Sequence, residues 1–257
     1  MTTVGSPLLS KADPAPVERI EGTGGLPALL VCEHAGQAVP EGLTSLGLAP
    51  DVFDLHIGWD IGAAAVTRLM AAELGCTAVL QRYSRLVIDC NRPTQAPDAI
   101  PPVSDGVAVP GNMGLNAADR SRRIEAIFAP FHAAVLAARA AGPQMILAIH
   151  SFTPEMASRP GPRPWHVGFL GRRDMATSEA LMDAVASERP DLSLALNEPY
   201  QVDDESDWFV PAHGEPSGLP HSLIEIRHDL IRTPEGQSEY AGLLSRAVRH
   251  LLEKTPC

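Results

Sequence analysis

Short apolar runs that alternate with helix-like segments constrain the fold of this chain most strongly. The apolar runs lie at 28–33, 77–81, 86–90, 144–152, 165–171 and the start of 221–230. Apolar residues recur at helical spacing in 61–75, 116–142, 176–188 and 235–253. Runs that are apolar throughout are typical of strands buried on both faces. The pattern therefore predicts an α/β fold, a three-layer α/β/α sandwich around a mostly parallel mixed sheet.

The length of 257 residues suits one large domain. Residues 1–26 are rich in Pro, Gly and Ser, which predicts an N-terminal arm, and residues 27–257 form a single α/β domain in this interpretation. Two long loop-like segments, 93–115 and 197–220, interrupt that domain. Loops of such length in a compact domain are often functional, so they are candidates for a lid over a ligand.

The formal net charge of −11 argues against nucleic-acid binding, which needs a concentrated basic surface. This net charge is compatible with a small anionic substrate, because a basic pocket can form locally in an acidic protein. The N-terminus lacks the pattern of a secretory signal, and no window reaches the roughly 20 apolar residues of a membrane span. We therefore expect a cytoplasmic protein without membrane contact; homo-oligomer formation is left open.

Four cysteines occur, at 32, 76, 90 and 257, without a CxxC pair. Cys32 and Cys90 lie within apolar runs, which predicts buried free thiols.

Polar residues follow several apolar runs at the point where each run ends. Glu33 and His34 follow the first, His150 closes another, and Glu225 with Arg227 lies in the last. Ligands in open α/β sheets bind beyond the carboxyl ends of the strands. Although a lone histidine at a strand end is more often structural, several such endings from distant parts of the chain predict a site.

Two imidazoles and a carboxylate are the protein ligands of many catalytic zinc sites. His34 and His150 are the natural pair, and either Asp60 or Glu33 supplies the carboxylate. A strand that continued through 33 and 34 would point these two side chains to opposite faces. We therefore favour Asp60, whose alternative role is to cap the helix that follows it.

Strand alternation places Glu225 and Arg227 on one side of their strand. They form a buried ion pair, or Glu225 acts as a general base. Arg85, Asn91 and Arg92 in "SRLVIDCNRP" are candidates for an anion clamp, with a solvated basic turn as the alternative. The chain contains no HExxH, no GxSxG and no glycine-rich phosphate loop, which removes the common zincin, serine-hydrolase and nucleotide-binding interpretations.

The ordered motifs "VCEHAG", "GWDIG", "YSRLVIDCNRP", "LAIHSF", "NEPY" and "GLPHSLIEIRHDLI" resemble those of the N-formylglutamate amidohydrolase family. The resemblance covers residues 27 to 250. That family is related to zinc carboxypeptidases and to the aspartoacylase and succinylglutamate desuccinylase enzymes. The resemblance implies a carboxypeptidase-like α/β/α fold and zinc-dependent hydrolysis of N-formyl-L-glutamate to formate and L-glutamate. Rival interpretations are a deacylase of another N-acyl amino acid or small peptide, and a non-catalytic small-anion-binding protein.

The resemblance also implies roles for individual residues. It supports His34 and His150 as zinc ligands and Glu225 as the general base. It implies that Asn91 and Arg92 hold a substrate carboxylate and that Arg85 joins them. Arg227, from its place on the strand of Glu225, is a further candidate for substrate binding. The wider superfamily places a glutamate three residues after its first histidine, where this chain has Gln37. A neutral amide is a poor zinc ligand, which is a further reason to expect the carboxylate from Asp60.

Overall fold

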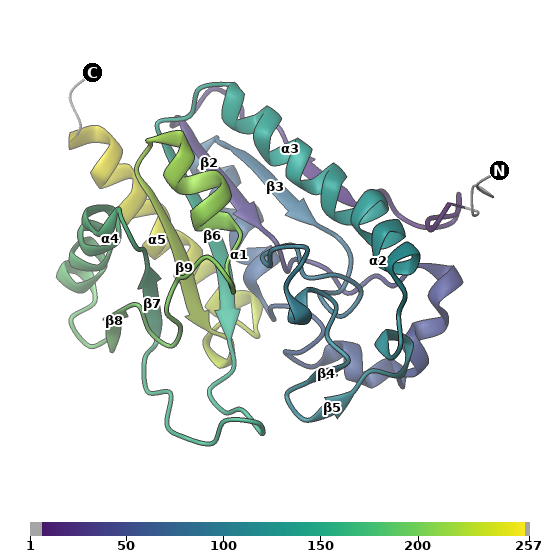
Figure 1. Cartoon of the computed structure of the whole chain (residues 1–257). Helices are drawn as coiled ribbons and strands as arrows, with labels where there is room; N and C mark the ends of the chain where they lie inside the picture. The colour runs from purple at the N-terminus through teal and green to yellow at the C-terminus, as the bar shows by residue number, and fades with distance from the viewer. Residues whose placement is uncertain (1–6, 255–257) are drawn as a thin grey trace.

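A seven-stranded mixed sheet forms the centre of the molecule in the computed structural model, which describes residues 7–254 (Figure 1). The strands lie in the order β1 (Val17–Ile20), β3 (Thr77–Gln81), β2 (Ala28–Cys32), β6 (Met145–Phe152), β9 (His221–Arg227), β7 (Val167–Leu170) and β8 (Leu194–Leu196). The pairings from β3 to β9 are parallel, β1 and β7 join antiparallel, and β8 is parallel to β7. The predicted mostly parallel mixed sheet is confirmed.

Helices cover both faces of this sheet (Figure 1). One face packs against α1 (Ala63–Leu74), α4 (Met175–Glu188) and α5 (Pro234–Lys254), and the other against α3 (Ala129–Ala140). In β2, Leu30 and Cys32 belong to the core on the α1 side, whereas Leu29 and Val31 belong to the core on the α3 side. The strand is apolar throughout because both of its faces are buried under helices, which confirms the predicted three layers.

The segment predicted as one helix at 116–142 is helical from 117 to 140 but not uniform. It comprises α2 (Ala117–Arg123), a π-helical turn at Ile124–Phe128, and α3. Pro130 cannot donate a backbone hydrogen bond to the preceding turn, and the wider turn lies just before it. Within the described residues, no helix has both the length and the apolar character that crossing a membrane requires.

The apolar run at 86–90 is not a strand, contrary to the sequence-based expectation. Leu86, Val87, Ile88 and Cys90 are buried, but they lie in a loop. Side chains satisfy the backbone here: Asn112 donates to the Leu86 carbonyl and Arg123 to the Val87 carbonyl. Because this loop is buried, its residues are as apolar as those of a buried strand, and the sequence pattern cannot distinguish the two.

Residues 17–20 of the predicted N-terminal arm form the edge strand β1, whereas residues 1–6 lie outside the described range. The segment 93–115 contains a small hairpin of β4 (Val103–Ser104) and β5 (Val107–Ala108). The segment 197–220 contains a π-helical turn at Phe209–Gly214. Short 3-10 turns occur at Glu41–Gly47, Pro50–Asp54, Pro97–Ala99, Pro110–Asn112, Glu215–Ser217 and His228–Leu230.

Cys32, Cys76 and Cys90 are free and buried. This confirms the prediction for Cys32 and Cys90, while Cys257 lies outside the described residues.

Candidate metal centre and catalytic cavity

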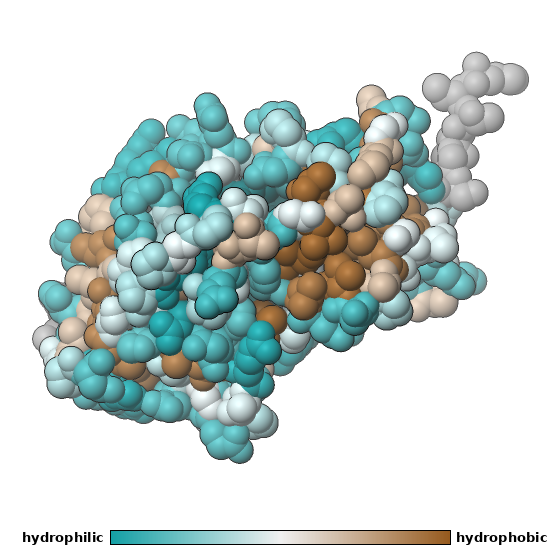
Figure 2. Space-filling model, turned by 90° about the horizontal axis from the view of Figure 1, so that it is seen from below, coloured by the Kyte–Doolittle hydropathy of each residue, from teal (hydrophilic) through white to brown (hydrophobic). Residues whose placement is uncertain are grey.

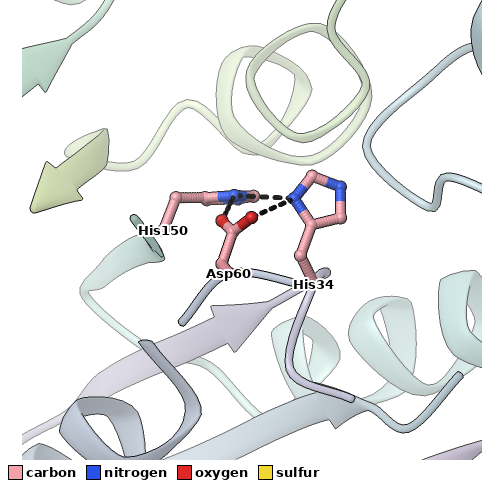
Figure 3. Close-up of side chains that lie close together, drawn as sticks. All are labelled: His34, Asp60 and His150. Carbon is pink, nitrogen blue, oxygen red and sulfur yellow. Dashed lines mark hydrogen bonds and ion pairs between the residues drawn. The ribbon is translucent and has the colours of Figure 1, made fainter. Parts of the chain in front are cut away.

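Three predicted ligands meet at the carboxyl edge of the sheet (Figure 3). His34 lies in the turn after β2, Asp60 in the loop before α1, and His150 within β6. All three are nearly inaccessible, with exposed fractions of 3%, 2% and 2%. Because β2 has ended at Cys32, strand alternation does not constrain residue 34.

The side chains of His34, Asp60 and His150 point toward one another (Figure 3). Nδ1 of His150 lies 2.9 Å from Oδ2 of Asp60, and Nδ1 of His34 lies 3.3 Å from Oδ1 of the same carboxylate. The two Nδ1 atoms are 3.2 Å apart. Two imidazole nitrogens this close to each other and to a carboxylate need a proton or a metal ion between them, because otherwise their lone pairs would repel.

The outer nitrogen of each imidazole contacts a second carboxylate. Nε2 of His34 lies 2.7 Å from Oδ1 of Asp89, and Nε2 of His150 lies 2.9 Å from Oε2 of Glu33. A carboxylate that accepts the Nε2 proton fixes the ring and directs the Nδ1 lone pair inward, as in many metal sites. Glu33 thus has the supporting role and Asp60 the inner one. The three residues fit a divalent cation bound by two nitrogens and one carboxylate.

Hydrogen bonds and neighbouring charges together determine the protonation states inside this cluster. Burial would lower the pKa of His150, but hydrogen bonds with Asp60 and Glu33 hold it well above the usual value. Burial would raise the pKa of Asp60, but the charge of His34 and hydrogen bonds from both imidazoles hold it far below the usual value. Asp60 is therefore anionic, and a proton and a metal ion compete for Nδ1 of His150.

Arg85 neutralises part of the negative charge around the cluster. Its Nη2 and Nε lie 2.7 and 3.1 Å from Oδ2 of Asp89, and its Nη1 lies 3.3 Å from Oδ1 of Asp60. Burial would raise the pKa of Asp89, but the charges of Arg85 and His34 keep it well below the usual value. Arg85 therefore orients the carboxylates of the cluster rather than standing free for a substrate.

A cavity of about 630 Å³ opens beside the cluster, and six predicted site residues line it: His34, Arg85, Asn91, Arg92, His150 and Glu225. Glu225 lies opposite His150 in the parallel register of β9 with β6. It is 6% exposed, and its Oε2 has no hydrogen-bond partner within the described chain. Burial, reinforced by the charge of Asp60, raises the pKa of Glu225 to about 7. A carboxylate of that pKa suits general acid–base chemistry near neutral pH.

Asn91 and Arg92 lie in the cavity wall with partners of their own. Oδ1 of Asn91 accepts hydrogen bonds from the backbone N–H groups of Trp208, at 3.2 Å, and Phe209, at 2.8 Å. Nε of Arg92 lies 3.0 Å from Oδ2 of Asp98, a half-exposed side chain. Asn91 thus ties the 197–220 segment to the cavity, and the Arg92 charge is accessible only in competition with Asp98.

Arg227 is not brought to this cavity. Its Nε lies 2.8 Å from Oδ1 of Asp229, and its Nη1 donates to the Pro164 carbonyl at 3.2 Å. The ion pair between Glu225 and Arg227, the alternative to a general base, does not form, because Asp229 offers a carboxylate just beyond the end of β9. Alternation gives the starting direction of a side chain, whereas a long arginine takes the nearest accessible partner.

No individual role for Asp89, Tyr200 or Arg159 was predicted from the sequence. Asp89 had a signal, because it lies in the same motif as Asn91 and at the end of an apolar run. Tyr200 lines the cavity, and its hydroxyl accepts a hydrogen bond from Arg163 at 3.2 Å. Tyr200 and Arg159 lie in loops, where no periodicity indicates which residues face a cavity.

The fold and the site together define an α/β enzyme with a candidate metal centre at the carboxyl edge of its sheet. The profile of the N-formylglutamate amidohydrolase family matches residues 26–232, which is most of the chain. The chain belongs to that family, and it is an amide-cleaving hydrolase by class.

Several solved structures are similar to this chain to different degrees. The Agrobacterium tumefaciens gene product Atu2144 is 36% identical over 95% of this chain and 99% of that chain, with a TM-score of 0.86. An N-formylglutamate amidohydrolase from Ralstonia eutropha JMP134 is 23% identical over 93% of this chain and 98% of that chain, with a TM-score of 0.63, and has the same fold. A metallo-carboxypeptidase from Burkholderia cenocepacia reaches a TM-score of 0.40 at 14% identity, over 92% of this chain and 60% of that chain. A search of curated proteins gave no match.

Proposed function

We propose that this protein is a metal-dependent amidohydrolase that cleaves N-formyl-L-glutamate to formate and L-glutamate. The observation that carries the proposal is the convergence of His34, Asp60 and His150 at one point beside the buried carboxylate of Glu225. Membership of the N-formylglutamate amidohydrolase family supports the formyl group and the amino acid.

Zinc is the metal that we propose, held by His34, Asp60 and His150. Two imidazole nitrogens and one carboxylate are a frequent ligand set of catalytic zinc. When bound, the ion would supply Lewis acidity toward an amide carbonyl and toward water. Glu33 and Asp89 would keep both imidazoles oriented through their Nε2 atoms.

Glu225 is the general base in this proposal. It would accept a proton from the water that attacks the formyl carbon, and pass that proton to the amide nitrogen as the C–N bond breaks. Formate leaves with the oxygen from water, and glutamate leaves as the amine. Two features support the role: Oε2 has no hydrogen-bond partner among the described residues, and burial raises the pKa of Glu225 to about 7.

Arg92 and Asn91 would bind one carboxylate of the substrate from the cavity wall. The ion pair of Arg92 with Asp98 is open to exchange, because the Asp98 side chain is 55% exposed and held by little else. The amide nitrogen of Asn91 adds a neutral donor, since its only partner in the described part of the chain is a distant Asp207 oxygen at 3.5 Å.

A formate-release assay with N-formyl-L-glutamate tests the proposal. Protein purified without chelators should contain zinc and release formate. Chelator-treated protein should lose the activity, and added zinc should restore it. If the zinc-loaded protein releases the amine from another N-acyl amino acid but not from this one, the substrate assignment is wrong. If it binds no metal under any condition, the hydrolytic mechanism is wrong.

A further inference from the structure

Three arginines line the cavity beside Glu225: Arg85, Arg92 and Arg159. Arg85 is bound to Asp89 and Asp60, and Arg92 to Asp98. Arg159 differs from both, because its guanidinium makes no hydrogen bond or ion pair with any described residue. Among the described residues that line the cavity, Arg159 is therefore the one arginine that an anionic ligand can bind without first displacing an intramolecular partner.

The backbone next to Arg159 is held at the rim of the cavity although the side chain is exposed. Asp105, at the tip of the hairpin formed by β4 and β5, accepts hydrogen bonds from two successive backbone N–H groups. These belong to Ala157, at 3.1 Å, and Ser158, at 2.7 Å. The loop that carries Arg159 follows β6, the strand of His150. Figure 1 shows this loop and the hairpin at the same edge of the sheet.

The acidic residues of the cavity lining increase the need for a free cation if an anionic substrate is to bind. Four aspartates line the cavity together with Glu225: Asp98, Asp105, Asp203 and Asp207. A substrate with two carboxylates would meet net repulsion there unless each carboxylate found its own cation. Seen from this edge, the surface has a hydrophilic area and, next to it, a hydrophobic area (Figure 2). Arg92 can serve one carboxylate, and the second requires another guanidinium.

We propose that Arg159 binds the side-chain carboxylate of the substrate and so makes the enzyme selective for an acidic N-acyl amino acid. Guanidinium binds a carboxylate through two parallel hydrogen bonds, which distinguishes it from an amide of the same shape. Asp105 is a positioning residue in this proposal, because it anchors the loop without contacting the substrate. The inference rests on the proposed function and adds the origin of its specificity.

The test compares N-formyl-L-glutamate with N-formyl-L-glutamine, two substrates of the same size that differ by one charge. Arg159→Gln should raise KM for N-formyl-L-glutamate by about 10- to 100-fold, the effect of losing a charge-assisted bond, with little change in kcat. KM for N-formyl-L-glutamine should stay within about twofold of the wild-type value. Arg159→Lys should retain part of the selectivity, because it keeps the charge but not the fork.

Arg173→Gln is the matched control. Arg173 is also an exposed arginine, with a side chain 77% accessible, and it does not line the cavity. Its replacement should leave both KM values unchanged. Asp105→Ala should produce the selective loss in a weaker form, because the loop is released but Arg159 remains. An equal loss on both substrates would indicate a merely structural role for Asp105.

Calorimetric binding of L-glutamate and L-glutamine separates this inference from the proposed function. The zinc-loaded wild type should bind glutamate more tightly than glutamine, and Arg159→Gln should abolish that preference. If the wild type releases no formate, the proposed function is wrong, while the binding preference still decides the role of Arg159. If the wild type shows no preference, or if Arg159→Gln keeps it, the inference is overturned.

Discussion

Replacing Asp89 by asparagine tests whether the outer carboxylates prepare the imidazoles for a metal. The substitution keeps the size of the side chain and an oxygen that can face Nε2 of His34, now at 2.7 Å. It removes the negative charge that stabilises the Nε2 proton. It also takes away the main anionic partner of Arg85, which contacts Asp89 at 2.7 Å and Asp60 at 3.3 Å.

Two effects of Asp89→Asn therefore act in the same direction. His34 becomes a less basic ligand, and Arg85 is free to compete with the metal for the Asp60 carboxylate. Loss of an outer partner typically lowers metal affinity about 10- to 100-fold, or about 1.4–2.7 kcal/mol. Because Arg85 is left with one carboxylate instead of two, we expect the upper part of this range. Asp98→Asn is the control, since Asp98 contacts Arg92 and no member of the cluster.

The assay is a competition for zinc between the protein and a chromophoric chelator at pH 7.5, with circular dichroism to confirm the fold. Glu33→Gln should weaken zinc binding to a similar extent through His150, whereas Asp98→Asn should not. A zinc affinity of Asp89→Asn within twofold of the wild type would refute the reasoning, provided that His34→Ala loses the metal in the same assay.

Three further predictions concern the base, the clamp and acid stability. Glu225→Gln should reduce turnover by about 10²- to 10⁴-fold while the bound zinc stays, and lost zinc would show that Glu225 is a ligand instead. Arg92→Ala should raise KM about 10-fold or more with a small change in unfolding free energy; an unchanged KM would remove Arg92 from substrate binding. Burial, with the nearby charges of His132 and Arg139, lowers the pKa of His213 to about 3. The unfolded chain, with a pKa of about 6.5, therefore binds a proton that the folded chain does not, and stability is lost as the pH falls below 6.5. Urea unfolding should show about 2 kcal/mol less stability at pH 5 than at pH 7 from this residue, and His213→Gln should reduce that pH dependence; an identical pH dependence in the variant would exclude it.

The strand ends were predictable because burial and parallel pairing leave few alternatives. The runs that became β2 and β6 are apolar on both sides, so their carboxyl ends must meet at one edge of the sheet. That brings His34 and His150 together from 116 residues apart. Asp60 could be favoured over Glu33 because a loop can approach the edge freely, although residues 33 and 34 form a turn and not the end of a strand.

Partner choice was not predictable from spacing. Arg85, Asn91 and Arg227 each have at least one partner from another segment: Asp60 for the first, residues 208 and 209 for the second, and Pro164 for the third. Spacing gives the direction in which a side chain leaves the backbone, but the partner depends on tertiary packing. The same limitation applies to the buried loop at 86–90, whose backbone is satisfied by side chains rather than by a neighbouring strand.

Gln37 shows how the ligand set is tied to the local fold. Its amide nitrogen donates to the Phe53 carbonyl at 2.8 Å and to Oδ1 of Asp54 at 3.0 Å. A glutamate at this position would place a carboxylate against a carbonyl and a second carboxylate, with no donor to offer either. Position 37 therefore needs a donor, and it holds the turn at 50–54 in place. Because that position is committed to packing, the carboxylate beside His34 and His150 has to come from a different segment, and Asp60 is the one that reaches them.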